Sequence, residues 1–341
     1  MYNDFYCAEL EQFSKREQLK LLDNKCVLIS GATGLIGSYL VDSILCSGLN
    51  CTIYCIVRNR KSALLRFEKY KSNKNLKFIQ SDFSKPIKFN KKIDYILHLA
   101  SFSDAVNYAK YPIQTMNTNI MGCKYLLDLA AKNGCKKFFY ASSSEIYGTS
   151  KLPMTEDNCG EVNPLDIRSC YNEAKRASET MCVSYKSQLG VDVVIGRFCR
   201  IYGPTMKLQD SKALSQFMMK SISGQNIILK SAGNQIYSYL YVSDAVSAIL
   251  TILQKGLNGE AYNIAEDRDV MALKDIAKFV AEQSNMKVEF QTQSELEKKG
   301  YSRVESAVLI SDKLKALGWK PDVSLKQGIK HTMQVLKQRI N

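Results

Sequence analysis

The stretch that decides the fold is CVLIS-GATGLIG-SYLVDSILCSG, residues 26–48. Residues 26–30 form a continuous apolar run, as expected of a strand that is buried on both faces. Gly31, Gly34 and Gly37 follow, and the apolar pattern then changes to a helical period. The order strand, glycine turn, helix predicts an α/β fold with a doubly wound parallel sheet and a dinucleotide at the helix start.

Each glycine of this turn has a separate expected role. Gly31 allows a tight turn, Gly34 lets a pyrophosphate approach the backbone, and Gly37 lets the helix pack closely on the strand. The unpaired N–H groups of the first helical turn then face the phosphates. The cofactor site also includes Thr33, Leu35 and Ile36. The alternative is a glycine-rich turn that binds no ligand.

The next strand, residues 52–57, ends at a basic residue instead of an acidic one. NAD-specific sites usually carry an acid here for the ribose 2′-hydroxyl, whereas this sequence has Arg58. A guanidinium suits a 2′-phosphate, so the sequence favours NADP over NAD. The alternative is a solvated basic loop, with the acid supplied from elsewhere.

Two further strands, residues 76–80 and 94–100, continue the doubly wound order. Asp82, followed by Phe83, comes after the first of them and can accept a hydrogen bond from the adenine amino group. The cofactor must pass the carboxyl end of the second strand. That end is formed by Leu99, Ala100 and Ser101.

A catalytic group is expected where the strand at 136–144 ends in serines. Ser143, Ser144 and Glu145 stand at this end, and Tyr171 and Lys175 open a downstream helix. Tyr and Lys four residues apart share one helix face. The Lys ammonium can lower the pKa of the Tyr and hold the nicotinamide ribose, while Tyr and Ser hydroxyls meet the same substrate oxygen. The Tyr–Lys spacing alone is weak, but the glycine turn upstream strengthens it.

These motifs together resemble the extended short-chain dehydrogenases/reductases, in the NAD-dependent epimerase/dehydratase branch that acts on nucleotide-activated sugars. The stretch from SSSEIYG to YVSDAV is most similar to UDP-glucuronate decarboxylases, and it also resembles dTDP-glucose 4,6-dehydratases and 4-epimerases. The matching motifs are GATGLIG (31–37), HLA (98–100), NIMG (119–122), SSSEIYG (142–148), YNEAK (171–175), RIYGP (200–204) and YVSDAV (241–246).

The resemblance implies a role for each matching residue. Ser143, Tyr171 and Lys175 would form the catalytic triad, with Glu145 as an additional acid/base. Lys175 and Tyr171 would also contact the cofactor. The other cofactor residues that the motifs imply are Gly31, Gly34, Gly37, Arg58, Asp82 and Asn119.

Three positions depart from the family pattern. Ser144 stands where the dehydratases have the Asp that protonates a leaving hydroxyl, and Tyr237 stands where the decarboxylases have an Arg. Arg200 stands where relatives usually have Asn. We hypothesise that Arg200 replaces the lost positive charge and binds the substrate pyrophosphate. The expected substrate site consists of Ser143, Ser144, Arg200 and Tyr237. The alternative is an Arg200 turned toward a surface carboxylate.

The expected activity is hydride transfer at a carbinol or keto carbon, C4 of a nucleotide-linked sugar or polyol. Arg58 favours a reductase or an epimerase, and so does the absence of the dehydratase Asp at Ser144 and of the decarboxylase Arg at Tyr237. The alternatives are a UDP-glucuronate decarboxylase or a 4,6-dehydratase with internally recycled NAD. A regulator that senses dinucleotides without catalysis is a remote alternative, because such a protein would be expected to lose Tyr171, Lys175 or Ser143.

Composition excludes several other classes of protein. The 341 residues include 47 Lys and Arg against 33 Asp and Glu, a net charge of +14, which suits a basic surface or a phosphate-bearing ligand. No compact basic helix suggests a nucleic-acid partner, and no apolar run approaches a membrane span. Only two His argue against a His-rich metal site or a Ser-His-Asp hydrolase. Eleven Cys without a CxxC motif indicate reduced thiols and a cytoplasmic location.

The domain organisation follows from the order of elements. Residues 1–24 are an N-terminal helical extension, and 25–197 form the dinucleotide-binding Rossmann domain, to which 245–265 return. Residues 198–341 form mainly a smaller C-terminal α/β substrate lobe. The family resemblance also implies a homodimer through a four-helix bundle, to which residues 112–133 and 170–189 would contribute.

Overall fold

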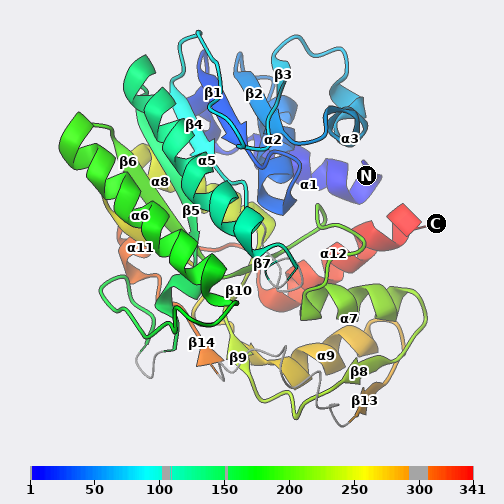
Figure 1. Ribbon diagram of the computed structural model, residues 1–341. Helices are drawn as coiled ribbons and strands as arrows, with labels where there is room; N and C mark the ends of the chain where they lie inside the picture. Colours follow the sequence, from blue (N-terminus) through cyan, green and yellow to red (C-terminus); the bar gives the residue numbers. More distant parts are fainter. Residues whose placement is uncertain (1, 102–107, 109, 150–152, 292–305, 341) are drawn as a thin grey trace.

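A parallel seven-stranded sheet forms the centre of the computed structural model, which describes residues 2–101, 108, 110–149, 153–291 and 306–340 (Figure 1). The strand order β11-β6-β5-β4-β1-β2-β3 is that of a doubly wound fold and confirms the expected fold class. The strands are β1 (Cys26–Ser30), β2 (Thr52–Val57), β3 (Leu76–Gln80), β4 (Tyr95–His98), β5 (Lys137–Ser143), β6 (Val193–Phe198) and β11 (Ala261–Ile264).

Helices cover both faces of the sheet, and the side chains alternate between two hydrophobic cores. In β1, Val27 and Ile29 belong to one core while Leu28 belongs to the other. The first core is closed by α2 (Leu35–Cys46) and α8 (Val242–Lys255), and the second by α5 (Pro112–Asn133) and α6 (Ser169–Leu189). This burial on both faces explains the apolar runs that predict the strands.

The N-terminal extension packs on the first core. It consists of α1 (Asp4–Ser14) and the 3-10 helix η1 (Glu17–Leu22). In α1 the side chains of Tyr6, Leu10 and Phe13 are buried. Glu9 accepts hydrogen bonds from Tyr39 of α2 at 2.8 Å and from Tyr241 at 3.0 Å. The extension is therefore bound to α2, the helix that follows the glycine turn.

Apart from α8 and β11, which belong to the main sheet and its first core, residues from 200 onward form small sheets and helices beside the main sheet (Figure 1). The strands are β7 (Arg200–Tyr202), β8 (Ile227–Leu229), β9 (Ile236–Tyr237), β10 (Tyr239–Tyr241), β12 (Met271–Ala272), β13 (Val288–Phe290) and β14 (Ser306–Ala307). The helices are α7 (Ala213–Ile222), α9 (Leu273–Glu282), α11 (Asp312–Ala316) and α12 (Leu325–Ile340).

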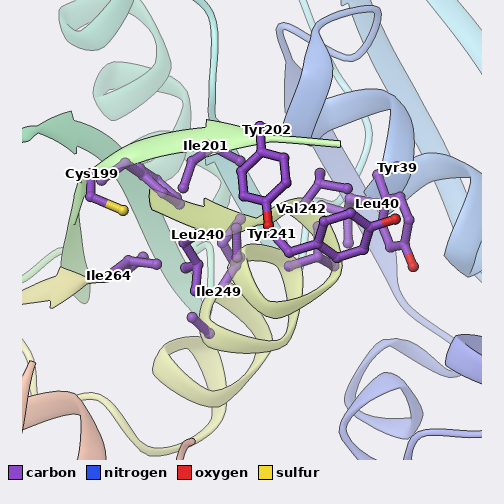
Figure 2. Close-up of a cluster of buried hydrophobic side chains, with 14 of the residues drawn as sticks. Tyr39, Leu40, Cys199, Ile201, Tyr202, Leu240, Tyr241, Val242, Ile249 and Ile264 are labelled. Atoms are coloured by element: carbon purple, nitrogen blue, oxygen red, sulfur yellow. The ribbon is translucent and has the colours of Figure 1, made fainter. Parts of the chain in front are cut away.

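The short pair β7 and β10 is anchored in the first core (Figure 2). Ile201 and Leu240 point to α8, and the ring of Tyr241 lies beside Tyr39 of α2. The Tyr202 hydroxyl donates to the carbonyl oxygen of Leu325 at 3.0 Å. This anchoring fixes Arg200, at the start of β7, relative to the main sheet.

Two observations bear on the expected environment of the chain. In the part of the chain that the structure describes, no helix has the length and apolar character needed to cross a membrane. All eleven Cys are free thiols.

Candidate active site

The glycine turn has the geometry that the sequence predicts. Gly31 has a φ of +72°, and a Cβ there would lie 2.7 Å from backbone atoms of Leu99 and Ala100. A Cβ on Gly37 would meet the carbonyl oxygen of Gly31. Glycine is therefore required at both positions, first for the turn and then for the close contact between α2 and the turn.

The start of α2 fits the pyrophosphate of a dinucleotide. Gly34 is the N-cap and supplies no capping side chain, so the N–H groups of the first turn have no side-chain partner there. A Cβ on Gly34 would meet a single atom within 4 Å, the carbonyl oxygen of Gly31 at 3.1 Å. Thr33 is exposed, and Leu35 and Ile36 are half-buried beside it. An anion can therefore approach this backbone closely.

The adenine end of the predicted site lies at the carboxyl ends of β2 and β3. Arg58 and Asp82 are both exposed here. Hydrogen bonds from Ser84 lower the pKa of Asp82, and the positive charge of Arg58 adds to this effect. Phe83 has a φ of +62°, and its buried ring packs edge-on against His98. The Phe83 ring thus belongs to the core, and its backbone is the part left to face a cofactor.

The predicted catalytic triad converges at the end of β5. Tyr171 and Lys175 are buried on α6, and the Ser143 side chain lies near enough to the Tyr171 phenol to lower its pKa. The Lys175 Nζ donates to the carbonyl oxygen of Ala141 at 2.6 Å and lies 5.6 Å from the ring centre of Tyr171. Three residues separated by up to 32 positions thus share one small volume.

Burial dominates the electrostatics of this triad. Burial raises the pKa of Tyr171 to about 12, although hydrogen bonds from Ser143, Ser101 and Tyr108 lower it. Burial lowers the pKa of Lys175 to about 7. The sequence predicts a Tyr made acidic by a charged Lys, whereas in the structure burial outweighs that effect and discharges the Lys near neutral pH.

Tyr108 is a site residue that the sequence analysis missed. Its ring stacks on the ring of Tyr171 with centres 4.5 Å apart and an angle of 13° between the planes. It is also buried, and its side chain lowers the pKa of Tyr171. Tyr108 precedes Tyr171 by 63 positions and belongs to no motif, so no sequence signal identifies it.

The other predicted residues lie around the triad. Ser144 and Glu145 open the 3-10 helix η3 (Ser144–Tyr147), which follows β5 directly. Leu99, Ala100 and Ser101 are half-buried where β4 ends. Asn119 is fully buried on α5, where its Nδ2 donates to the carbonyl oxygen of Thr115 at 2.8 Å.

Arg200 and Tyr237 are brought together face to face. The guanidinium carbon of Arg200 lies 3.5 Å from the ring centre of Tyr237. Among the residues that the structure describes, no carboxylate pairs with Arg200, in contrast to the surface-carboxylate alternative. A positive charge therefore stands over the position at which the sequence lacks the Arg of the decarboxylases.

His98 lies at the end of β4, beside the glycine turn. His98 is buried, its Nδ1 lies 2.7 Å from the Ser30 hydroxyl, and burial lowers its pKa to about 3, so the ring is neutral. Within the described ranges, no group of three or more His, Cys, Asp or Glu could hold a metal ion. A cavity of about 590 Å³ between α6, β6 and β11 is lined by none of the predicted site residues.

Comparison with known proteins identifies the family. Residues 27–265 match the model of the NAD dependent epimerase/dehydratase family. The chain belongs to this family. It is 30% identical over 340 residues to the UDP-glucuronic acid decarboxylase 1 of Danio rerio, an alignment that covers 97% of this chain and 78% of that protein. The chain is therefore an enzyme of this NAD-dependent family, as its motifs predict.

Solved structures share the whole fold at lower sequence identity. A UDP-N-acetylglucosamine 4-epimerase from Methanobrevibacter ruminantium is 20% identical with a TM-score of 0.81, over 93% of this chain and 99% of that one. A dTDP-glucose 4,6-dehydratase from Bacillus anthracis, solved in complex with NAD, is 21% identical with a TM-score of 0.76, over 92% and 97%. At these identities the similarity establishes the fold alone.

Proposed function

We propose that this chain transfers hydride at C4 of a nucleotide-activated sugar or polyol, as an epimerase or a reductase. The convergence of Ser143, Tyr171 and Lys175 at the end of β5, beside a turn that fits a dinucleotide pyrophosphate, carries this proposal. The family membership and the nucleotide-sugar relatives support it.

The chain's own residues handle the proton of the reacting hydroxyl. A bound nicotinamide dinucleotide would supply the hydride acceptor. Tyr171 takes the C4 hydroxyl proton, and Ser143, within hydrogen-bond reach of that phenol, orients the same oxygen. Lys175 lies beside the Tyr171 ring, where its charged form favours the phenolate. The closely packed rings of Tyr108 and Tyr171 exclude water from this side.

The test is a substrate panel read by NMR. The purified protein is incubated with UDP-glucose, UDP-galactose, UDP-glucuronate, dTDP-glucose and a nucleotide-linked 4-keto sugar, with and without added NADH or NADPH. Appearance of a C4-inverted sugar without added cofactor identifies an epimerase, and reduction of the corresponding 4-keto sugar identifies a reductase. Unchanged spectra with every sugar and both cofactors would contradict the proposal.

A second candidate function is UDP-glucuronate decarboxylation. The stacked pair of Arg200 and Tyr237 favours it, because Arg200 returns a cation to the position of the missing Arg. The relatives named as UDP-glucuronic acid decarboxylases favour it as well. Release of labelled CO₂ from uniformly ¹³C-labelled UDP-glucuronate would establish this outcome. A 4,6-dehydratase is less favoured, because Ser144 supplies no acid.

Arg200 is expected to bind the substrate pyrophosphate. We expect Arg200→Ala to raise KM for a nucleotide-sugar by about 10- to 100-fold with a smaller change in kcat, because a hydrogen bond to a charged group contributes about 1.5 to 3 kcal/mol. Steady-state kinetics measure the effect. Arg268, whose side chain is 71% exposed, provides the control Arg268→Ala. An unchanged KM for Arg200→Ala would contradict the assignment.

We propose further that the cofactor site prefers NADP, on the basis of Arg58 at the end of β2. We expect Arg58→Ala to weaken NADPH binding by about 10- to 100-fold and to leave NADH binding within about twofold, because only NADP carries the 2′-phosphate. Fluorescence titration with both dinucleotides measures this, with Arg60→Ala as the control. Tightly retained NAD in the purified protein would contradict the preference.

We also propose a homodimer formed through α5 and α6. These helices pack on each other, and their outer faces carry exposed apolar side chains, among them Ile113 at 70%, Met116 at 38% and Val183 at 45% exposure. Two such helix pairs facing each other would bury these groups. A cytoplasmic location is likewise a proposal, supported by the eleven free thiols.

A further inference from the structure

The side-chain amide of Asn172 faces Glu145 at the start of α6. Its Nδ2 donates to the backbone carbonyl oxygen of Glu145 at 2.7 Å and to the carboxylate Oε2 at 3.4 Å. An amide nitrogen carries two hydrogens, so one Asn can make both bonds together. Both partners are acceptors, which requires the nitrogen, and not the amide oxygen, to face Glu145. Asn172 therefore holds the backbone and the carboxylate of the same residue.

Glu145 is connected to the catalytic tyrosine on its other side. Its N–H donates to the Ser143 hydroxyl at 3.2 Å, and the Ser143 side chain lowers the pKa of the neighbouring Tyr171. The negative charge of Glu145 raises the pKa of Tyr171, so the two groups lie within electrostatic reach. Among the described residues, Asn172 is the one side chain that hydrogen-bonds to the Glu145 carboxylate. Without it, this carboxylate would be free to rotate away from Tyr171.

We propose that Asn172 is a positioning residue, which holds the Glu145 carboxylate beside Tyr171 so that this carboxylate can accept a hydrogen bond from a hydroxyl group of the bound sugar. This inference rests on the proposed function, in which Tyr171 and Ser143 bind the C4 oxygen of that sugar. Asn172 itself touches neither substrate nor cofactor in this assignment, and it acts through Glu145.

Arg176 provides a matched comparison one turn further along α6. It donates to the carbonyl oxygen of Ile146 at 2.8 Å and to that of Gly160 at 2.7 Å. Like Asn172, the Arg176 side chain thus binds the 3-10 helix η3, but its acceptors are backbone carbonyl oxygens and not the Glu145 carboxylate. A purely structural role would make the two residues behave alike, whereas the proposal separates them by their dependence on Glu145.

A double-mutant cycle between Asn172 and Glu145 tests the inference. We expect Asn172→Ala to lower kcat by about 10- to 100-fold in the wild-type background, because a small misplacement of a reacting group is costly, with KM within about threefold. In the Glu145→Gln background the same change should cost less than about twofold, because the carboxylate that Asn172 positions is then absent. Arg176→Lys should cost the same factor in both backgrounds.

The pH profile of kcat provides a second readout. Asn172→Asp keeps the side-chain size but places a like charge against Glu145, so we expect the acid limb of the profile to move to higher pH. Equal losses from Asn172→Ala in both backgrounds, together with an unmoved acid limb, would overturn the inference alone. A wild-type protein that turns over no nucleotide-sugar would overturn the proposed function and this inference with it.

Discussion

Replacing Tyr171 by Phe is expected to lower kcat by about 10² to 10⁴-fold, the usual contribution of a positioned acid/base. The phenol is the group that the Ser143 hydroxyl contacts, and the buried ring is fixed by stacking on Tyr108 at 4.5 Å. Phe keeps the ring and its stacking, so the change removes the proton carrier without opening a cavity. Turnover of the active sugar from the NMR panel measures the loss.

The controls separate this chemical effect from a loss of folding or binding. Tyr185 lies on the same helix, where its hydroxyl donates to Asp128, and Tyr185→Phe should leave kcat within about twofold. Cofactor retention by the Tyr171→Phe protein should match that of the wild type. Full turnover by Tyr171→Phe would show that another group carries the proton, and the catalytic assignment would be wrong.

The strands and the shared helix face of Tyr171 and Lys175 could be predicted from sequence because these signals are local. β1 and β2 are largely apolar runs buried on both faces, whereas β3, at the edge of the sheet, is partly exposed. The predicted ranges 26–30, 52–57 and 76–80 coincide with β1, β2 and β3. Gly31 and Gly37 are required by backbone contacts within one turn and its neighbouring strand end. Tyr171 and Lys175 share a face because of helix geometry alone.

The other features of the candidate site depend on contacts between segments that are distant in the sequence, and no local sequence pattern predicts such contacts. The stacking of Arg200 on Tyr237 arises from the relative placement of β7 and β9, and the contact of Tyr108 with Tyr171 from the approach of two separate segments. The pKa values of Tyr171 and Lys175 depend on burial, which the Tyr–Lys spacing does not reveal. The pattern of residues 1–24 predicts a helix, but it does not predict that this helix packs on α2.

The largest expected effect on stability comes from Asp42, a fully buried carboxylate of α2. It accepts hydrogen bonds from the hydroxyls of Tyr2 at 2.7 Å and Tyr6 at 2.6 Å, and it pairs with the Arg66 guanidinium at 2.5 Å. Burial and the Asp42 charge raise the pKa of Tyr6 well above its ordinary value, so this hydroxyl remains a donor. These contacts join the N-terminal extension, α2 and Arg66 of α3 (Arg60–Arg66).

We expect Asp42→Ala to lower the free energy of unfolding by about 3 to 5 kcal/mol, because it leaves the buried Arg66 charge without its carboxylate partner and the Tyr6 hydroxyl without its acceptor. Urea denaturation measures the loss. The exposed pair of Glu17 and Lys20, with side chains 79% and 69% exposed, provides the control, since Glu17→Ala should cost less than about 1 kcal/mol. The double change Asp42→Ala with Arg66→Met should recover part of the loss, because no charge is then left unpaired. A midpoint for Asp42→Ala equal to that of Glu17→Ala would contradict this account of how the extension is held.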